Sequence, residues 1–456
     1  MGAGISGMLR KTPKEGGMMR RMALAALAMG VILGSAVPVS AATAPKDMPI
    51  PKGSQACVDC HRKEKVAATA IEEWKHSTHA KEGVGCLDCH EAKKEDKDAF
   101  DHYGKLVATI VTPNDCAQCH EKESKQFQGS HHAKGGEILG SLDNFLGEVV
   151  EGPPAAISGC KQCHGGVVKI LPNGKIDPTT WPNTGIGRIN PDGSRGACSA
   201  CHSRHLFSAK VARSPESCGK CHLGPDHPQK EIYDESKHGI AFYANRDRMN
   251  LDSRSWVLGK DYTAAPTCST CHMSATVDLP VTHDPGERIS WTLRPAISKK
   301  LENWEKRRDT MKAVCINCHN RKFSDAFFTQ YDITVELYNE KFAQPATELM
   351  KKLQNAGKLT PAQFDEKIEW TYYLLWHHEG RRARHGASMM APDYTQWHGF
   401  FEVAERFYME LLPEAERLMP GSTEFILAQD QHKWMKGMSK EERDKIQKFY
   451  EERYGK

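Results

Sequence analysis

The pattern Cys-x-x-Cys-His occurs eight times in this chain of 456 residues, and all 16 cysteines belong to these copies. The motif cysteines are Cys57, Cys60, Cys86, Cys89, Cys116, Cys119, Cys160, Cys163, Cys198, Cys201, Cys218, Cys221, Cys268, Cys271, Cys315 and Cys318. The histidines that end the motifs are His61, His90, His120, His164, His202, His222, His272 and His319. Two thiols bond covalently to one c-type haem in such a motif, and the histidine becomes an axial ligand of the iron. The sequence therefore predicts eight covalently bound haem c groups.

Zinc and disulfide bonds are the alternatives for paired cysteines. A structural zinc site collects four ligands, and it would not place a histidine at the same offset after every cysteine pair. A disulfide framework has no use for a histidine after every second cysteine. Haem attachment accounts for both residue types and for their spacing.

The N-terminal segment has the character of a secretory signal. Arg20 and Arg21 precede an apolar run over residues 22–37, and small residues follow at 39–42. This run is too short and wrongly flanked for a membrane span. We predict that residues 1–42 are a signal peptide, with an uncleaved anchor as the alternative. An exported protein with haem-bearing thiols is expected in the periplasm, as a soluble protein.

The charge of the mature chain argues against nucleic acid as a partner. The formal charge of the whole chain is +4, and residues 1–42 account for all of it. Each oxidised haem with its two propionates adds about one negative charge, so the loaded protein is expected to be acidic.

The motifs divide the mature chain into two regions. Successive motifs start 29, 30, 44, 38, 20, 50 and 47 residues apart, which leaves little polypeptide for each haem. We predict an octahaem-binding domain over residues 43–323, with loops, short helices and little sheet around a core packed with haem. Residues 324–456 are rich in helix formers and are predicted to form a C-terminal domain of three or four long helices. The fold class is therefore mainly α.

Three signals place helix ends in the C-terminal region. Thr360-Pro361 has the pattern of an N-cap followed by proline in the first turn, and Ser439 with Glu442 forms a capping box. Pro345 is expected to end or kink the helix before it.

The histidines outside the motifs supply candidates for the second axial ligand. The chain has 22 histidines, of which 14 lie outside the motifs. A haem that only carries electrons at low potential commonly has histidine on both sides of the iron, so eight or seven further ligands are needed. The candidates for this role are His79, His102, His132, His205, His238, His283 and His378, with His377 and His385 as alternatives to His378.

His227 differs from the other histidines, because Asp226 precedes it in the segment Cys-His-Leu-Gly-Pro-Asp-His. Pro225 stiffens this segment, so the carboxylate and the imidazole can project together. Such a pair beside an iron with an open coordination position suits proton transfer. The alternatives are that His227 is another axial ligand, or that Asp226 caps a helix.

The chain resembles the hydroxylamine oxidoreductase family of octahaem cytochromes c. The resemblance rests on the order of the eight motifs, on CHLGPDH after the sixth motif, on THDPGERISW at 282–291, and on HHEGRRARHGASMMAPDYTQWHG at 377–399. The family implies a homotrimer with seven bis-histidine haems and one five-coordinate catalytic haem at the fourth motif. Cys160 and Cys163 would bind that haem, with His164 as its proximal ligand and Asp226 and His227 as an acid–base pair.

The resemblance leaves the direction of the reaction open. In oxidative members, a tyrosine from a neighbouring subunit is crosslinked to the catalytic haem, and Tyr394 is the best match here. Members with this crosslink oxidise hydroxylamine or hydrazine, and members without it are thought to reduce nitrite or hydroxylamine. Tyr331, Tyr372 and Tyr373 are alternative neighbours of the site.

The sequence thus indicates an enzyme that exchanges electrons with a small nitrogen compound at one haem. A redox partner cytochrome or a quinone-linked membrane protein would take or supply the electrons. The absence of a Cys-x-x-Cys-Lys motif argues against the related families that hold the catalytic haem through lysine. The alternative is a multihaem cytochrome that only carries electrons.

Overall fold

The computed structural model describes residues 49–51, 53–138 and 145–455, and these described residues belong to one compact unit. The predicted signal peptide, residues 1–42, lies outside the described residues. No helix in the described part of the chain is both long enough and apolar enough to cross a membrane.

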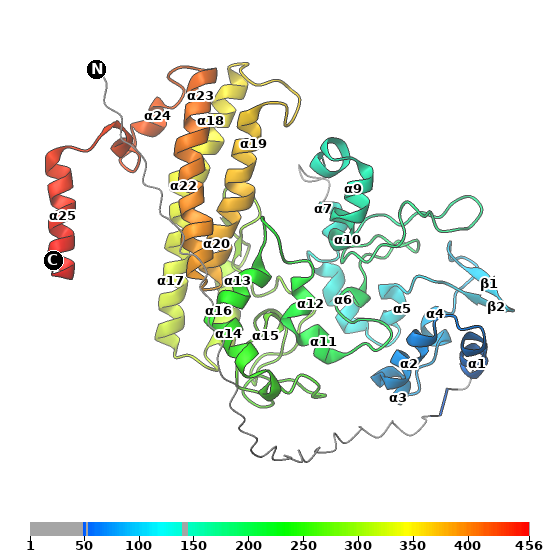
Figure 1. Cartoon of the computed structure of the whole chain (residues 1–456). Coiled ribbons are helices and arrows are strands. Elements are labelled where there is room, and N and C mark those ends of the chain that lie inside the picture. The colour runs from blue at the N-terminus through cyan, green and yellow to red at the C-terminus, as the bar shows by residue number, and fades with distance from the viewer. Residues whose placement is uncertain (1–48, 52, 139–144, 456) are drawn as a thin grey trace, which may run out of the picture. The chain divides into compact units, whose positions relative to one another are not determined.

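Short helices joined by loops form the region that carries the motifs (Figure 1). The helices are α1 (Gln55–Lys63), α2 (Ala68–His76), α3 (Thr78–Lys81), α4 (Leu87–His90), α5 (Pro113–Ala117), α6 (Glu121–Gly129), α7 (Gly135–Ile138), α9 (Pro153–Ser158), α10 (Cys160–His164), α11 (Ala209–Arg213), α12 (Pro215–Gly219), α13 (Gln229–Glu235), α14 (Lys237–Ala244), α15 (Cys268–His272) and α16 (Trp304–Cys315). Single turns of other helix types are η1 (Leu146–Val150), η2 (Cys198–Ala200) and η3 (Arg246–Arg248). The prediction of short helices and loops here is confirmed.

Strand structure is sparse. Strands β1 (Phe100–His102) and β2 (Lys105–Val107) form an antiparallel hairpin. Strands β3 (Trp291–Thr292) and β4 (Lys299–Lys300) form a second antiparallel pair. The fold is mainly α, as predicted.

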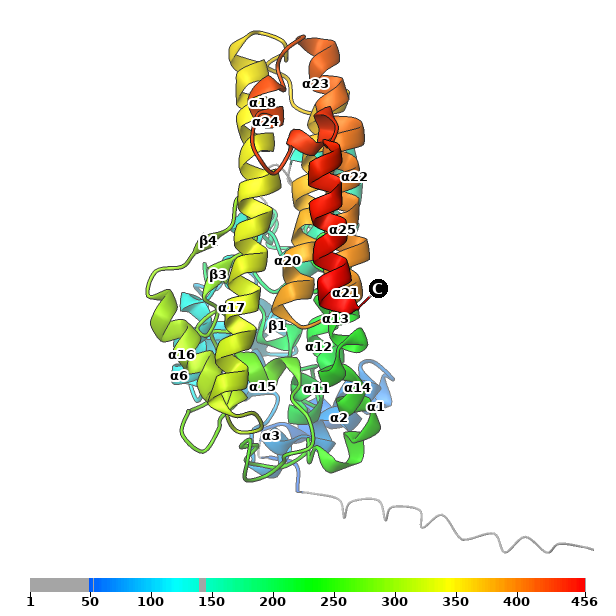
Figure 2. The ribbon, with the colours of Figure 1, turned by 90° about the vertical axis from the view of Figure 1, so that its left-hand side faces the viewer.

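Long helical runs form the C-terminal region, and Figure 2 shows them side by side. The first run joins α17 (Arg321–Tyr338), η4 (Asn339–Ala343) and α18 (Gln344–Asn355). The second joins α19 (Lys367–Tyr373), η5 (Leu374–Glu379) and α20 (Gly380–Ser388). The third joins α21 (Pro392–Thr395), η6 (Gln396–Phe401), α22 (Glu402–Arg406), η7 (Phe407–Leu411) and α23 (Leu412–Leu418). The chain continues through α24 (Glu424–Leu427) and η8 (Lys433–Lys436) to α25 (Lys440–Tyr454). The long helices predicted for this region are therefore present.

Apolar residues at helical spacing hold these runs together. In the first run the spacing of the buried side chains is three or four residues, at Phe328, Tyr331, Val335, Tyr338 and Phe342. Residues at this spacing share one face of a helix. Phe328, Tyr331 and Val335 pack in a cluster with Trp291 and Leu293. Farther along the run, the face joins the other two runs in a second cluster, which includes Tyr338, Leu349, Leu375, Val403, Phe407 and Leu411.

One predicted helix signal is confirmed, whereas the helix expected to end or kink at Pro345 continues through the proline. The capping box of Ser439 and Glu442 starts α25. Pro345 lies in the first turn of α18, directly after the π-helical turn η4, so the helix changes its geometry there without ending. The proline has no N–H to donate, and the wider turn accommodates the missing bond.

The predicted helix start at Thr360-Pro361 is wrong. Helix α19 begins at Lys367, and Glu366 with Glu369 supplies its capping box. The Thr360 hydroxyl instead accepts a bond from the Ala362 N–H and donates to Asp365, which closes a local turn. Side chains of this type compete with a helix for backbone partners, and here the turn is favoured.

Helix α20 fixes the long runs against the motif-bearing region. The Arg384 guanidinium is fully buried and donates to the Ser298 hydroxyl at 2.6 Å and to the Pro295 carbonyl at 3.2 Å. It also lies over the ring of Tyr338. The predicted boundary between residues 323 and 324 falls inside α17, so one continuous helix joins the two regions.

Candidate haem centres and the Asp226–His227 pair

Local helical structure explains the spacing of the motifs. In α10 and α15 the whole Cys-x-x-Cys-His sequence is one helical turn. The same turn closes in other motifs through a bond from the histidine N–H to the carbonyl of the first cysteine, as at His120 and Cys116 with 2.8 Å. Residues i, i+3 and i+4 lie on one face of a helix. Both thiols and the imidazole can therefore reach the same haem.

Five motif histidines face a second histidine from another part of the chain. The distances between their ring centres are 5.9 Å for His61–His102, 6.2 Å for His79–His120, 6.4 Å for His90–His205, 6.0 Å for His132–His222 and 6.1 Å for His238–His319. Two imidazoles bound to opposite sides of one metal, with bonds of about 2 Å, have ring centres about 6 Å apart. The residues present therefore fit bis-histidine haem iron at these five positions.

Two further predicted ligands have less specific surroundings. His283 lies close enough to His202 for their charges to interact. His378 lies beside Tyr373 and His377, and burial lowers its pKa to about 4. The assignment of these two residues as ligands stays a prediction.

Hydrogen bonds orient several motif histidines from behind. His90 Nδ1 lies 2.9 Å from the Ala108 carbonyl, and His272 Nδ1 lies 3.1 Å from the Pro285 carbonyl. An acceptor on Nδ1 leaves Nε2 as the nitrogen available to a metal. At His222 the Nδ1 partner is the Gln229 side chain, at 3.3 Å.

The cysteine thiols show which motifs adjoin. Cys57 lies close to Cys86, Cys116 to Cys198, Cys163 to Cys221 and Cys218 to Cys268, near enough for the sulfur atoms of each pair to change each other's pKa. Weaker electrostatic contacts join Cys89 to Cys116, Cys201 to Cys218 and Cys271 to Cys315. These contacts connect the motifs in the order one, two, three, five, six, seven and eight. The fourth motif joins this series at the sixth.

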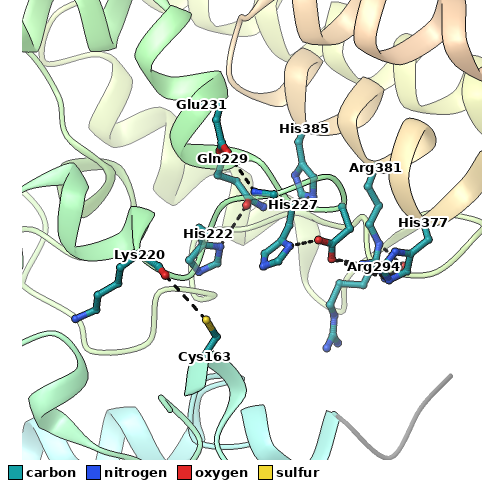
Figure 3. Close-up of polar contacts among 12 residues, drawn as sticks. Cys163, Lys220, His222, His227, Gln229, Glu231, Arg294, His377, Arg381 and His385 are labelled. Atoms are coloured by element: carbon teal, nitrogen blue, oxygen red, sulfur yellow. Dashed lines mark hydrogen bonds and ion pairs between the residues drawn. The ribbon is translucent and has the colours of Figure 1, made fainter. Parts of the chain in front are cut away.

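Asp226 and His227 form a close pair beside the junction of the fourth and sixth motifs. Figure 3 shows His227 near His222 of the sixth motif, with Cys163 of the fourth motif facing them. His227 Nδ1 donates to Asp226 Oδ1 at 2.6 Å. The Cys163 thiol of the fourth motif interacts with His227 and lies 4.0 Å from the Lys220 carbonyl. The ring of His227 is also 5.9 Å from that of His222. Distance alone would therefore allow His227 to act as a ligand, but the bond to Asp226 sets it apart from the other histidines.

The electrostatics of the pair favour an ionised carboxylate. Burial alone would raise the pKa of Asp226, but the hydrogen bond from His227 and the charges of His227 and Arg381 lower it to about 2. For His227, burial lowers the pKa, and the bond to Asp226 more than offsets this, so the pKa lies above its usual value. A carboxylate of this kind fixes the imidazole and stabilises its protonated form.

The second helical run supplies residues that the sequence did not assign to this site. Arg381 Nη1 donates to Asp226 Oδ2 at 3.2 Å, and His377 Nε2 lies 4.0 Å from the same oxygen. Gln229 connects His222 to His385, with Nε2 of Gln229 3.4 Å from Nε2 of His385. The spacing of His377, Arg381 and His385 by four residues is visible in the sequence, but the loop that they face is not.

Tyr394 lies close to helix α13, near Glu231 and Glu235. It belongs to α21, and its ring is 5.4 Å from that of His398. Burial and the nearby charges of Glu231 and Glu235 raise its pKa. Its predicted crosslink involves a second subunit and stays a prediction.

The alternative tyrosines differ in their surroundings. The hydroxyl of Tyr373 is 3.2 Å from His377 Nε2, so this residue adjoins the group around Asp226. Tyr331 is buried in an apolar cluster with Phe328 and Val335, and Tyr372 bonds Thr347.

Comparison with known proteins agrees with the motifs. Residues 191–366, which hold the fifth to eighth motifs, match a family model described as a seven-times multihaem cytochrome with CxxCH motifs. A probable nitrite reductase–hydroxylamine oxidoreductase fusion protein of Kuenenia stuttgartiensis is 27% identical over 60% of this chain and 35% of its own length. The chain is a multihaem c-type cytochrome, and it is similar to a protein named for hydroxylamine oxidoreductase. This cytochrome spans about a third of the length of that fusion protein.

Two solved structures share the fold of the cytochrome. One is described as a hypothetical multihaem protein, with a TM-score of 0.72, 25% identity, and coverage of 81% of this chain and 97% of the other. The second is a reducing hydroxylamine oxidoreductase-like protein complex of Kuenenia stuttgartiensis, with a TM-score of 0.60, 20% identity, and coverage of 80% and 84%. Since these alignments cover most of each chain, the arrangement of motifs and long helices belongs to a known fold.

Proposed function

We propose that this cytochrome is a periplasmic octahaem oxidoreductase acting on a small nitrogen compound. The substrate would be hydroxylamine or hydrazine in oxidation, or nitrite or hydroxylamine in reduction. The observation that carries the proposal is the Asp226–His227 pair beside the thiol of Cys163. The relation to a protein named as a nitrite reductase–hydroxylamine oxidoreductase fusion supports the substrate class.

The residues of the fourth motif and of the pair have separate roles in this proposal. Cys160 and Cys163 would hold the haem, and His164 would be its axial ligand. When bound, this haem supplies an iron that exchanges electrons with the substrate. Oxidation of hydroxylamine releases protons, and reduction of nitrite consumes them. His227 would accept or donate these protons at Nε2, while Asp226 holds Nδ1.

The other motifs would carry electrons between the site and a partner. Five histidine pairs at the spacing of bis-histidine iron support this role. The fourth motif contacts the sixth motif, so the haem of the sixth motif would be the direct electron-transfer neighbour of the catalytic haem. The partner would be a redox cytochrome or a quinone-linked membrane protein, and the enzyme would be a homotrimer.

Spectroscopy and two variants of His227 test the proposal. The oxidised protein should show one high-spin ferric haem among low-spin haems in its paramagnetic resonance spectrum. His227→Ala should lower turnover of hydroxylamine, hydrazine or nitrite by about 10²–10⁴-fold with full haem content, because the proton-transferring group is lost. His227→Gln should be equally slow, although it fills the same space. The exposed His76 gives the control, since His76→Ala should retain turnover. Full activity of both His227 variants would exclude the acid–base role.

The direction of the reaction depends on Tyr394. If the enzyme is oxidative, mass spectrometry should show that the haem peptide around Cys160 is crosslinked to a peptide that contains Tyr394. Two results together would indicate a reductive enzyme. The haem peptide would carry no crosslinked tyrosine peptide, and the enzyme would reduce nitrite faster than it oxidises hydroxylamine.

A pure electron carrier is the second candidate. The five histidine pairs support it, because haems with two histidine ligands carry electrons and leave no position on the iron for a substrate. In that case every haem should be low-spin. His227→Ala would then shift one potential and leave no turnover to lose.

A further inference from the structure

The guanidinium of Arg381 contacts both the Asp226 carboxylate and a segment of the motif-bearing region. We propose that Arg381 is a positioning residue, which holds Asp226 in the orientation that presents His227 Nε2 to the substrate. This inference rests on the proposed function, because it assigns a residue to the same site.

Arg381 is held in place by groups other than Asp226. Its Nε and Nη2 both donate to the Arg294 carbonyl, at 3.1 Å and 2.8 Å. The guanidinium also lies over the ring of Trp376, 5.2 Å from its centre. The side chain is only 12% exposed. The planar fork is therefore fixed by a backbone carbonyl and an aromatic ring, and it presents Nη1 in a set direction.

Nη1 of Arg381 donates to two acceptors. One is Asp226 Oδ2 at 3.2 Å, and the other is His377 Nε2 at 2.9 Å. Because a guanidinium only donates, His377 Nε2 must accept in this arrangement. Arg381 thus orients the imidazole of His377 and the carboxylate of Asp226 together.

The two oxygens of Asp226 have different partners. Oδ1 accepts from His227 Nδ1, and Oδ2 accepts from Arg381. A carboxylate held at one oxygen cannot rotate freely about its bond to the chain, so the other oxygen stays aimed at the imidazole. The proton of neutral His227 is then kept on Nδ1, and Nε2 faces away from the carboxylate. Without Arg381, water would compete for both oxygens, and the imidazole would lose its fixed direction.

The position of Arg381 also connects two distant segments of the chain. Arg381 belongs to α20, whereas Asp226 belongs to the loop before α13, 155 residues earlier. Figure 3 shows the helix and the loop facing each other across this contact. The long C-terminal helices would therefore contribute to proton transfer, because they hold the loop that carries Asp226 and His227 in place.

Two variants of Arg381 test this inference. Arg381→Lys keeps the charge, but its single nitrogen cannot reproduce the planar fork that reaches Asp226 and His377 through Nη1 and the Arg294 carbonyl through Nε and Nη2. Arg381→Gln removes the charge as well. Both should lower kcat by about 10–100-fold, the usual cost of removing an outer partner of a catalytic group. KM should change by less than about threefold, since Arg381 touches no substrate.

A spectrum separates positioning from general damage. Haem content should match the wild type in both variants, while the paramagnetic resonance signal of the high-spin haem should broaden or shift as His227 loses its fixed orientation. Arg308→Lys is the matched control, because Arg308 forms a buried pair with Asp332 and contacts neither Asp226 nor His227. This control should leave kcat and the high-spin signal unchanged, even if it lowers the melting temperature.

A double-mutant cycle with Asp226→Asn decides whether Arg381 acts through the carboxylate. Combining Arg381→Gln with Asp226→Asn should cost little more than Asp226→Asn alone, because the two residues form one unit. Independent, multiplying losses in kcat would overturn the inference, and so would wild-type kcat in Arg381→Lys and Arg381→Gln. Absence of any high-spin haem or turnover in the wild type would instead overturn the proposed function.

Discussion

Gln229 illustrates how one side chain can tune a haem ligand. Its side-chain carbonyl oxygen lies 3.3 Å from His222 Nδ1, so it accepts a hydrogen bond from that imidazole. Such an acceptor makes a ligating imidazole more basic and stabilises the oxidised iron. The Gln229→Leu variant should therefore raise the potential of one haem by about 20–60 mV, the equivalent of one ordinary hydrogen bond. Gln229→Glu should lower it, because a carboxylate accepts more strongly. Spectroelectrochemical titration measures both, and equal potentials in the two variants would contradict the prediction.

At the residue scale, the sequence predicted the groups that share a local pattern and missed those that meet across the fold. The motif cysteines and histidines lie within one helical turn, so their spacing could be interpreted without a structure. Asp226 and His227 are adjacent in the chain and could be paired in the same way. Arg381 and Gln229 act through contacts 155 and 156 residues apart, and no local pattern encodes such a distance.

At the scale of elements, the apolar cluster of the three long runs is expected to dominate the stability of the C-terminal region. Leu349 on α18 is fully buried in this cluster. Leu349→Ala should reduce the free energy of unfolding by about 2–5 kcal/mol, through lost burial and the cavity left behind. Lys351→Ala on the same helix is exposed and should change it by less than about 0.5 kcal/mol. Denaturant unfolding followed by helical circular dichroism provides the comparison, and similar values for the two variants would contradict the assigned core.

A buried histidine should make the same region sensitive to acid. His432 is fully buried, and its Nδ1 lies 2.9 Å from the Tyr408 hydroxyl. Burial, and then the charge of Lys341, lowers its pKa to about 4. Between about pH 6.5 and pH 4, the unfolded chain therefore binds a proton here that the folded chain does not, so acidification favours unfolding. The melting temperature should fall through this window.

The variant His432→Gln isolates this contribution, because glutamine has no proton to gain. Its melting temperature should change less steeply between pH 6.5 and 4 than that of the wild type, whatever its absolute value. Parallel curves for the two proteins would assign the acid sensitivity to other groups.

The helix ends show why element boundaries were predicted unevenly. The side chains of Ser439 and Glu442 each bond the backbone N–H of the other residue, so the predicted capping box is present. Thr360 has the same type of side chain, but it bonds within its own loop and leaves the capping of α19 to Glu366. Composition was enough to predict long helices in this region. The start of α19 could not be predicted in the same way, because it depends on which local hydrogen bonds Thr360 and Glu366 form.

At the scale of the whole molecule, the order of the motifs in space differs from their order in the chain. The thiol contacts run from the third motif to the fifth and attach the fourth to the sixth. Sequence spacing could not predict this branch, because loops of 20 to 50 residues allow many arrangements. The branch places the proposed site next to the middle of the series, with a path toward the first motif and another toward the eighth.

This arrangement predicts that the sixth motif controls all electron flow to or from the site. His132 faces His222 of that motif at 6.0 Å, and His238 faces His319 of the eighth motif at 6.1 Å. Methionine in place of an axial histidine raises a haem potential. His132→Met should therefore trap electrons on the haem of the sixth motif, next to the fourth motif, and slow turnover. His238→Met changes the haem of the eighth motif at the end of the series, and electrons can avoid it by moving toward the first motif. Rapid mixing with the substrate should show the fourth haem changing redox state at the wild-type rate in both variants, with the remaining haems delayed only in His132→Met. Equal delays in the two variants would mean that electrons do not follow the order of the thiol contacts.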